Sequence, residues 1–303
     1  MTTVPGLSPS TVGEAGEMAA AAIAEAEALT SRHPRAGHVP VGPLTVFNGD
    51  LDAAADLCIA AVRARRGLRV ATANMDFVAR ARRDEILRLD LERSSLVVAD
   101  GAPVAWLARL AGGRQTRRVT GVDLVAAICS RASEASPVRV AFYGGEPAIA
   151  SQAAIELERR YPGVRVVTRI SPPYRAMSPD EVDADVAALA LARPDVVLIA
   201  LGCPKQERFI AEHFGALPGA TWIGVGGTFD FYAGRRRRAP KFLQNAGAEW
   251  LTRLAQEPRR LWRRYLKDDL PSLLHVAPAA LRNRRLADAS EVDELRRSLT
   301  GAA

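Results

Sequence analysis

Polar residues follow several short β-branched runs of this 303-residue chain, where predicted strands end. Asp100 follows the run Ser95–Ala99 and precedes Gly101, while Thr72 and Asn74 lie at the end of another such run. A carboxylate at a strand tip can take a proton from a hydroxyl group or bind a ribose, and the hydroxyl and amide can orient a sugar or a base. Asp100 can equally cap the next helix, and Thr72 and Asn74 can equally form a turn or a cap. These alternatives stay open on the sequence alone.

A third candidate segment is Gly202-Cys-Pro-Lys-Gln-Glu207. Pro204 predicts a helix start, and Lys205, Gln206 and Glu207 fall in its first turn. Free backbone N–H groups and a cation there can face an anion. An ordinary helix that begins at a proline is an equally good interpretation.

Two glycine-rich turns complete the set, and each lets the backbone approach a ligand closely. A plain tight turn also requires glycines, so this signal is weak by itself. The candidate ligand-binding residues of these turns are Gly144, Gly145, Gly226, Gly227 and Asp230.

The elements that must position these residues alternate between strands and helices. The predicted strands are Leu44–Phe47, Leu68–Thr72, Ser95–Ala99, Val138–Tyr143, Val164–Ile170, Val196–Ala200 and Ala220–Val225. The predicted helices include Asp52–Arg65, Asp76–Leu89, Val122–Ser133, Pro147–Arg160 and Pro179–Leu191. This alternation predicts an α/β fold with an open, mostly parallel, Rossmann-like sheet and helices on both faces. Ligands of such sheets bind at the carboxyl ends of the strands.

Three regions follow from this pattern. Residues 1–40 are predicted to be a loosely ordered N-terminal extension, 41–243 a catalytic α/β domain, and 244–303 a basic, amphipathic helical appendage with a tail. Within the appendage, Pro258 is expected to start a helix and Pro271 to end a segment.

The net charge of +7 is concentrated in one stretch. Between Arg235 and Lys267 there are eleven Lys and Arg residues but only two acidic ones, Glu249 and Glu257. Trp250 and other aromatic residues accompany this block, which favours a polyanionic partner such as a diphosphate, an anionic lipid or a nucleic acid. A solvated, charged helix face is the plainer interpretation.

Several classes of protein and site are disfavoured. No apolar run reaches the roughly 18–20 residues that a membrane span needs, and the acidic, alanine-rich N-terminus does not have the pattern of a secretory signal. Three scattered cysteines argue against a disulfide framework and suit a reducing cytosol. The Asp-x-Asp pair Asp50/Asp52 begins a predicted helix, and the pair Asp183/Asp185 lies inside one. Residues two apart on a helix diverge, so Asp183 and Asp185 are poor co-ligands, and no metal site is predicted.

Taken together, these segments resemble the WecG/TagA/CpsF family of bacterial glycosyltransferases, glycosyltransferase family 26, from about Leu44 to Lys267. The segments that carry the resemblance are Thr72-Ala-Asn74, Val98-Ala-Asp100-Gly101-Ala-Pro103, Arg118-Val-Thr-Gly121-Val-Asp123-Leu, Tyr143-Gly-Gly145, Gly202-Cys-Pro-Lys-Gln-Glu207, Gly224-Val-Gly-Gly-Thr-Phe-Asp230-Phe-Tyr-Ala-Gly234 and Glu249-Trp-Leu-Thr-Arg253-Leu. Each segment is modest alone, but seven in this order are hard to obtain by chance.

The resemblance implies an inverting transfer, without a metal or other cofactor, of N-acetylmannosamine or a related hexose. The donor would be a UDP-sugar and the acceptor a polyprenyl-diphosphate-linked sugar. Asp100 would be the catalytic base, and Thr72, Asn74 and Gln206 would line the substrate pocket. The appendage would attach the enzyme to the anionic cytoplasmic face of the inner membrane as a peripheral protein, with Arg253, Arg260 and Arg263 over the diphosphate. Relatives assemble as dimers or trimers, so a homo-oligomer is a further implication.

Two rival interpretations remain. A nicotinamide or flavin oxidoreductase on a similar sheet would require a Gly-x-Gly-x-x-Gly fingerprint, and none precedes Asp100 at the usual distance. A basic nucleic-acid-binding module would use the stretch from Arg235 to Lys267. The aromatic residues there recur with leucines near helical spacing, which is typical of an amphipathic face more than of a base-stacking platform. We therefore expect no nucleic-acid partner.

Overall fold

A computed structural model describes residues 37–240, 243 and 248–284 of the chain. The side chains of Arg253 and Arg260 are outside the described part as well. Residues 1–36 and 285–303, which form most of the predicted N-terminal extension and the end of the predicted tail, therefore do not enter the description below.

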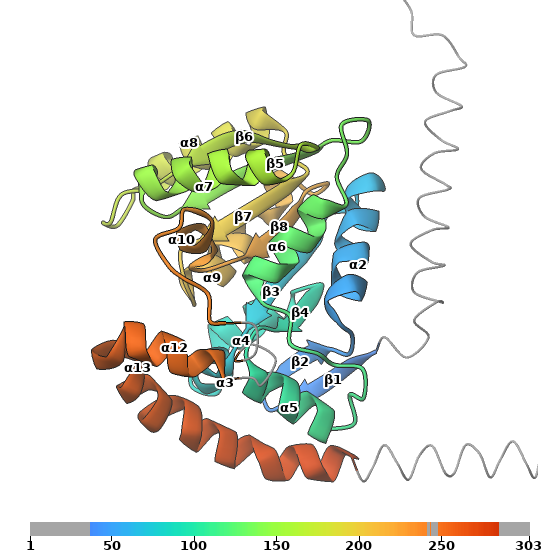
Figure 1. Ribbon diagram of the computed structural model, residues 1–303, viewed down its shortest axis with the longest axis vertical. Helices are drawn as coiled ribbons and strands as arrows, with labels where there is room; N and C mark the ends of the chain where they lie inside the picture. Colours follow the sequence, from blue (N-terminus) through green and yellow to red (C-terminus); the bar gives the residue numbers. More distant parts are fainter. Residues whose placement is uncertain (1–36, 241–242, 244–247, 285–303) are drawn as a thin grey trace, which may run out of the picture.

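Six parallel strands form the central sheet in the order β4-β3-β8-β7-β5-β6 (Figure 1). Their bounds are β3 (Arg69–Ala73), β4 (Leu96–Ala99), β5 (Val138–Gly144), β6 (Val164–Ile170), β7 (Val196–Ala200) and β8 (Thr221–Gly224). Each matches a predicted strand to within a residue or two. The parallel pairing confirms the predicted α/β fold class.

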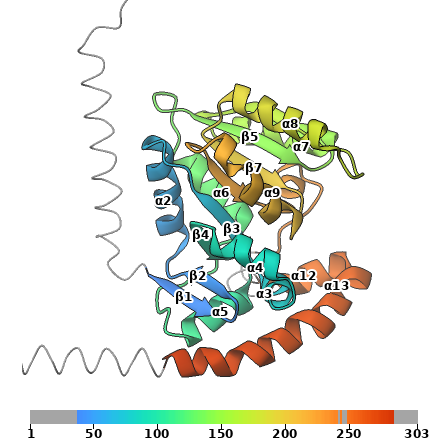
Figure 2. The ribbon, with the colours of Figure 1, turned by 180° about the vertical axis from the view of Figure 1, so that it is seen from behind.

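Helices cover both faces of this sheet (Figures 1 and 2). Side chains alternate along β5, so Val140 and Phe142 enter one core and Ala141 and Tyr143 enter another. The first core is covered by α2 (Leu51–Arg63), α6 (Gly121–Ser130), α7 (Pro147–Arg160) and α10 (Thr228–Tyr232). The second is covered by α8 (Pro179–Ala192), α9 (Lys205–His213) and the short 3-10 helix η1 (Phe214–Ala216).

The predicted strand Leu44–Phe47 exists, but it is not part of the parallel sheet. It forms β2, which pairs antiparallel with β1 (His38–Val41) in a separate two-stranded sheet. Only two residues connect the strands, and Gly42 takes a φ of +60°, as a tight hairpin requires. Because β1 begins at His38, the first strand crosses the predicted boundary between residues 40 and 41.

The predicted helix Asp76–Leu89 is two helices, so this prediction was wrong. They are α3 (Met75–Ala81) and α4 (Glu85–Glu92). The break falls at Asp84, whose side chain accepts a hydrogen bond of 3.0 Å from the backbone N–H of Leu87 and caps α4. The chain can then turn between α3 and α4, and both pack in a third core with the hairpin and with α5 (Ala102–Leu110).

The basic appendage is helical, as predicted, and comprises α12 (Glu249–Gln256), α13 (Pro258–Arg264), the π-helical turn η2 (Tyr265–Asp269) and helical residues 270–284. Pro258 starts α13 as expected, but Pro271 does not end a segment. A proline cannot donate the usual helical hydrogen bond, and the wider turn of η2 directly before it accommodates this defect. The helix continues past Pro271 (Figures 1 and 2). Buried Val276 and Ala280 join the third core.

Gly144, at the end of β5, gives a test of this architecture. Its φ is +104°, and an added Cβ would lie 2.6 Å from the carbonyl oxygen of Ala200. Gly202 has a φ of +76° but open space around it. We expect Gly202→Ala to lower the free energy of unfolding by about 1–2 kcal/mol through backbone strain alone. Gly144→Ala should lower it by more than about 3 kcal/mol, measured by urea unfolding. Equal losses in the two variants would contradict the close packing of β5 on β7.

Candidate active site

A cavity of about 870 Å³ lies at the carboxyl ends of the strands β3, β4, β5, β7 and β8. Residues of the appendage, including Leu261 and Arg264, also line it. Among the residues predicted for the site, its wall contains Thr72, Asn74, Asp100, Gly145, Gln206, Gly226, Gly227, Asp230 and Arg263. The strand ends thus bring together most of the residues selected from the sequence.

A second cavity, of about 380 Å³, lies between α5 and the appendage. Its wall is mostly apolar and aromatic: Met75, Ala102, Pro103, Trp106, Trp250, Tyr265, Leu266, Leu270 and Leu273. The predicted residue Gly101 belongs to this wall and not to the larger one. The chain therefore offers an apolar compartment beside a polar one.

Five residues line both cavities: Asn74, Asp100, Thr120, Glu249 and Arg264. They mark the boundary between the polar and the apolar compartment. The arrangement has room for a molecule with a polar head and an apolar tail across this boundary.

Asp100 directly follows β4 and is half-buried. Its backbone N–H donates to the carbonyl oxygen of Ala73, which attaches it to the neighbouring strand. The N-cap of α5 is Gly101, which makes no side-chain capping bond, so Asp100 is not the cap. Asn74 does cap a helix, because its Oδ1 accepts from the backbone N–H of Asp76 at 3.0 Å. Its amide nitrogen can still donate to a ligand.

Thr72 and Gln206 connect the strand ends and loops that form the floor of the larger cavity through hydrogen bonds. The hydroxyl of Thr72 donates to the carbonyl oxygen of Gly224 at 2.7 Å. The Oε1 atom of Gln206 accepts from the backbone N–H groups of Gly202, at 3.2 Å, and Gly226, at 3.1 Å. One amide thus joins the loop after β7 to the loop after β8, and the position of each loop depends on it.

Glu207 orients this amide. Gln206 donates through Nε2 to Glu207 Oε1 at 2.7 Å, and both side chains are buried. The Gln206 amide oxygen accepts from both loops, so its nitrogen faces Glu207, whose Oε1 accepts from it. Burial raises the pKa of Glu207 to about 7 from its usual value of 4.5.

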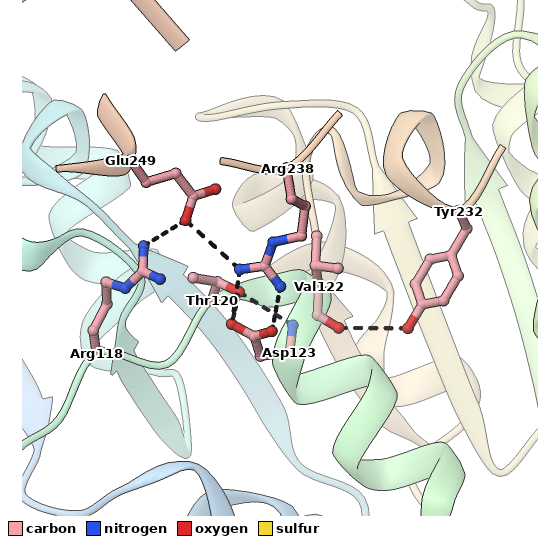
Figure 3. Close-up of polar contacts among 7 residues, drawn as sticks. All are labelled: Arg118, Thr120, Val122, Asp123, Tyr232, Arg238 and Glu249. Carbon is pink, nitrogen blue, oxygen red and sulfur yellow. Dashed lines mark hydrogen bonds and ion pairs between the residues drawn. The ribbon is translucent and has the colours of Figure 1, made fainter. Parts of the chain in front are cut away.

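Arg118, Asp123, Arg238 and Glu249 form a group of ion pairs (Figure 3). All of them except Asp123 line at least one of the two cavities. Arg238 binds Asp123 through both ends of its guanidinium, and Thr120 donates to Asp123 at 2.7 Å. Glu249 accepts from Arg118 at 2.7 Å and lies 3.6 Å from Arg238. Burial by itself would raise the pKa of Asp123, but the hydrogen bonds from Arg238 and Thr120 hold it below its usual value.

Other cations on the wall of the larger cavity are also paired with acids. Arg235 lies 2.7 Å from Glu146, and Arg236 lies 2.7 Å from Glu257 of the appendage. The basic stretch predicted from the sequence is therefore not a continuous solvated face. Part of it lines the cavity, where acids from distant segments partly neutralise it.

Four predicted residues lie outside both cavity walls: Gly144, Pro204, Lys205 and Glu207. Gly144 permits close packing on Ala200, and Pro204 is the N-cap of α9. Lys205 is exposed, and Glu207 acts behind Gln206. Arg253 and Arg260 were also predicted for the site, and their side chains lie outside the described residues.

The sequence interpretation missed Arg118, Thr120, Asp123, Arg238 and Glu249 as site residues. One signal was present, because Thr120 and Asp123 have the spacing of a helix N-cap and its partner, and Thr120 does cap α6. The pairing with Arg238 and Glu249 had no such signal. It joins residues 115 and 131 positions apart in the chain.

Within the described ranges, no group of three or more His, Cys, Asp or Glu residues is placed to hold a metal ion. Asp50 caps α2, and Asp52 pairs with Arg131 at 3.0 Å. Asp185 accepts a hydrogen bond from Tyr143. No helix among the described residues is long and apolar enough to cross a membrane.

Comparison with known proteins gives this site its context. Residues 39–286 match the Glycosyl transferase WecG/TagA/CpsF family. The chain belongs to this family. The match extends further toward both ends than the predicted range of Leu44 to Lys267, so it includes all but the first residue of the hairpin and the helix after Pro271. The protein is accordingly a glycosyltransferase, and the oxidoreductase interpretation is set aside.

Two relatives of this glycosyltransferase are named N-acetylglucosaminyldiphosphoundecaprenol N-acetyl-beta-D-mannosaminyltransferase. The protein of Bacillus spizizenii is 30% identical over 201 residues, which is 66% of this chain and 76% of the relative. The protein of Bacillus subtilis is 28% identical over 200 residues, which is 66% of this chain and 75% of the relative.

The burial of Glu207 beneath the larger cavity can be tested through the pH dependence of stability. Its folded-state pKa lies above the unfolded value, so its contribution to stability is full below about pH 4.5 and is lost as pH rises through about 7. We expect Glu207→Gln, compared with wild type, to gain stability on the order of 3 kcal/mol between these pH values. Urea unfolding across pH 4.5–8 measures this difference. A constant difference would contradict a buried, titrating Glu207.

Proposed function

We propose that the chain is an inverting, metal-independent glycosyltransferase. It would move N-acetylmannosamine or a related hexose from a UDP donor to a polyprenyl-diphosphate-linked sugar in cell-surface polysaccharide synthesis. The observation that carries the proposal is the position of Asp100, which lies where a polar cavity meets an apolar one. A nucleotide-sugar fits the larger compartment, and a lipid-linked acceptor has the polar head and apolar tail that the two compartments accept together.

In this reaction Asp100 takes the proton of the acceptor hydroxyl as the oxygen attacks the anomeric carbon of the donor. The bond from that carbon to the UDP oxygen breaks on the opposite face, which inverts the configuration. General base catalysis of this kind contributes about 10²–10⁴ in rate. Asn74, at the same boundary, can donate a hydrogen bond that orients the acceptor or the donor sugar.

Negative charge develops on the departing diphosphate and must be stabilised. The arginines that line the larger cavity supply donors for it: Arg80, Arg235, Arg236, Arg238, Arg263 and Arg264. Guanidinium groups bind phosphate oxygens through paired hydrogen bonds, most strongly where water is excluded. Arg263 and Arg264 belong to the appendage, so the appendage takes part in leaving-group stabilisation.

The appendage also carries a surface suited to a membrane. Trp262, Leu266, Leu270, Leu274 and Leu281 are exposed, and their spacing places them along one side of the helical segment. Leu266 and Leu270 also line the apolar cavity, so this surface is continuous with the compartment proposed for the lipid tail.

The same helical segment carries exposed basic residues, among them Arg259, Arg263, Lys267 and Arg282. An exposed apolar strip together with basic residues is the pattern of a helix that lies in an anionic membrane surface. We therefore propose peripheral attachment to the cytoplasmic face of the inner membrane, and no nucleic-acid partner.

Asp100→Asn tests the reaction. The assay measures transfer from a panel of UDP-sugars to a polyprenyl-diphosphate-N-acetylglucosamine acceptor in EDTA. We expect wild type to turn over and the variant to lose at least about 10²-fold in kcat, because the amide cannot take the proton. Asp180→Asn, an exposed change on α8, is the matched control and should retain activity. Loss of wild-type activity in EDTA would contradict metal independence, and an active Asp100→Asn would contradict the base.

Leu274→Glu with Leu281→Glu tests the membrane surface. Neither residue lines a cavity, and they are 66% and 47% exposed. We expect binding to anionic phospholipid vesicles to fall at least about tenfold, because apolar burial is lost and charge repulsion is added. Sedimentation with vesicles measures this binding. A parallel binding assay with an oligonucleotide tests the nucleic-acid interpretation.

The control for this pair is Leu191→Glu with Ile155→Glu, on α8 and α7, where both residues are also exposed. This control should bind vesicles like wild type. Equal losses in both pairs would show a general charge effect, and binding to the oligonucleotide in preference to vesicles would favour the nucleic-acid interpretation.

A further inference from the structure

Glu249 is a buried acid at the first position of α12, where the appendage meets the catalytic domain. It is 6% exposed. Its Oε2 atom accepts a hydrogen bond of 2.7 Å from Arg118 Nη1 and lies 3.6 Å from Arg238 Nη2 (Figure 3). A single carboxylate from the appendage thus binds one arginine and lies close to another, both from the catalytic domain.

The two arginines belong to different compartments. Arg118 precedes α6 and lines the apolar cavity, whereas Arg238 follows α10 and lines the polar one. Glu249 lines both, as Asp100 does. Its carboxylate therefore stands at the boundary where, in the proposed function, the head of the lipid-linked substrate must lie.

Charge and donor geometry make Glu249 a competitor for a diphosphate at this place. Carboxylate and phosphate oxygens use the same guanidinium donors. Asp123 and Glu249 balance Arg118 and Arg238, so the four side chains together carry no net charge. A diphosphate that entered beside them would be repelled by Glu249 and would find the Nη1 donor of Arg118 already engaged.

We propose that Glu249 is an internal counter-anion, which holds Arg118 and Arg238 in the free enzyme and is displaced when a diphosphate enters. The inference rests on the proposed function, because that function supplies the diphosphate. Asp123 stays on Arg238 in either state, since it comes from the catalytic domain. Displacement of Glu249 moves the start of α12, so occupancy of the site and the position of the appendage become linked.

Glu249→Gln tests the proposal, because it keeps the size and the acceptor oxygen of the side chain and removes its charge. The probe is inorganic pyrophosphate, and its Kd is measured by calorimetry on the full chain without membranes or donor. We expect the variant to bind pyrophosphate at least about tenfold more tightly than wild type.

Two controls accompany it. Asp52→Asn removes one carboxylate that pairs with Arg131 at 3.0 Å, remote from both cavities, and should leave the Kd unchanged. Arg118→Gln combined with Glu249→Gln should abolish most of the gain, because the freed donor is then missing. If Glu249→Gln does not fold, as judged by circular dichroism, Glu249→Asp takes its place. Its shorter side chain loosens the contact and should give a smaller gain in the same direction.

An unchanged or weaker affinity in the Glu249 variant would overturn the proposal and leave Glu249 as a structural partner of Arg118. A similar gain in Asp52→Asn would overturn it too, because it would reflect overall charge. Pyrophosphate binding does not need sugar transfer. If the Glu249 variant gains affinity for pyrophosphate but the wild-type protein transfers no sugar, the counter-anion role stands and the proposed function is refuted. If the wild-type protein transfers sugar but the variant gains no affinity, the proposed function stands and the counter-anion role is refuted.

Discussion

Parallel strand pairing is the constraint on which the rest of this structure depends. Because β3, β4, β5, β7 and β8 run in one direction, their carboxyl ends open at one edge of the sheet. Residues as far apart in sequence as Thr72 and Gly226 come together there without a dedicated contact between them. The loops after parallel strands do not share the hydrogen bonds of the strands, so other contacts must hold them in place. Gln206 supplies such contacts, because its amide oxygen accepts hydrogen bonds from two loops and its amide nitrogen donates to Glu207.

The sheet and most of its edge were predictable from the sequence for a simple physical reason. Strands buried on both faces are nearly continuous apolar runs, as in Leu96–Ala99, and a polar residue directly after such a run must lie at the sheet edge. The first strand of the hairpin was missed, because its four residues include a proline and follow a Gly and Pro-rich stretch. Pro271 was misread because a local rule stops helices at proline, whereas the π-helical turn before it depends on the surrounding helix.

Charge was the least predictable property of the site. The sequence shows a basic stretch, but the acids that neutralise it lie far away: Glu146 for Arg235, and Asp123 for Arg238. Such pairs need the fold to exist before they can be recognised, since no spacing rule connects residues 115 positions apart. Part of the basic stretch, including Arg263 and Arg264, lines the larger cavity, whereas Arg259 and Lys267 are exposed outside it.

The appendage changes what the sheet edge can do. Without it, the polar carboxyl ends of the strands would be open to solvent, and Asp100 would be exposed on the side of α5. With it, Tyr265, Leu266 and Leu270 line the apolar cavity beside Asp100, and Arg263 and Arg264 line the polar one. The helix that supplies these residues also presents exposed leucines outward. The surface that would meet a bilayer and the wall that would hold the lipid are therefore two sides of one element, so a shift of that element alters both at once.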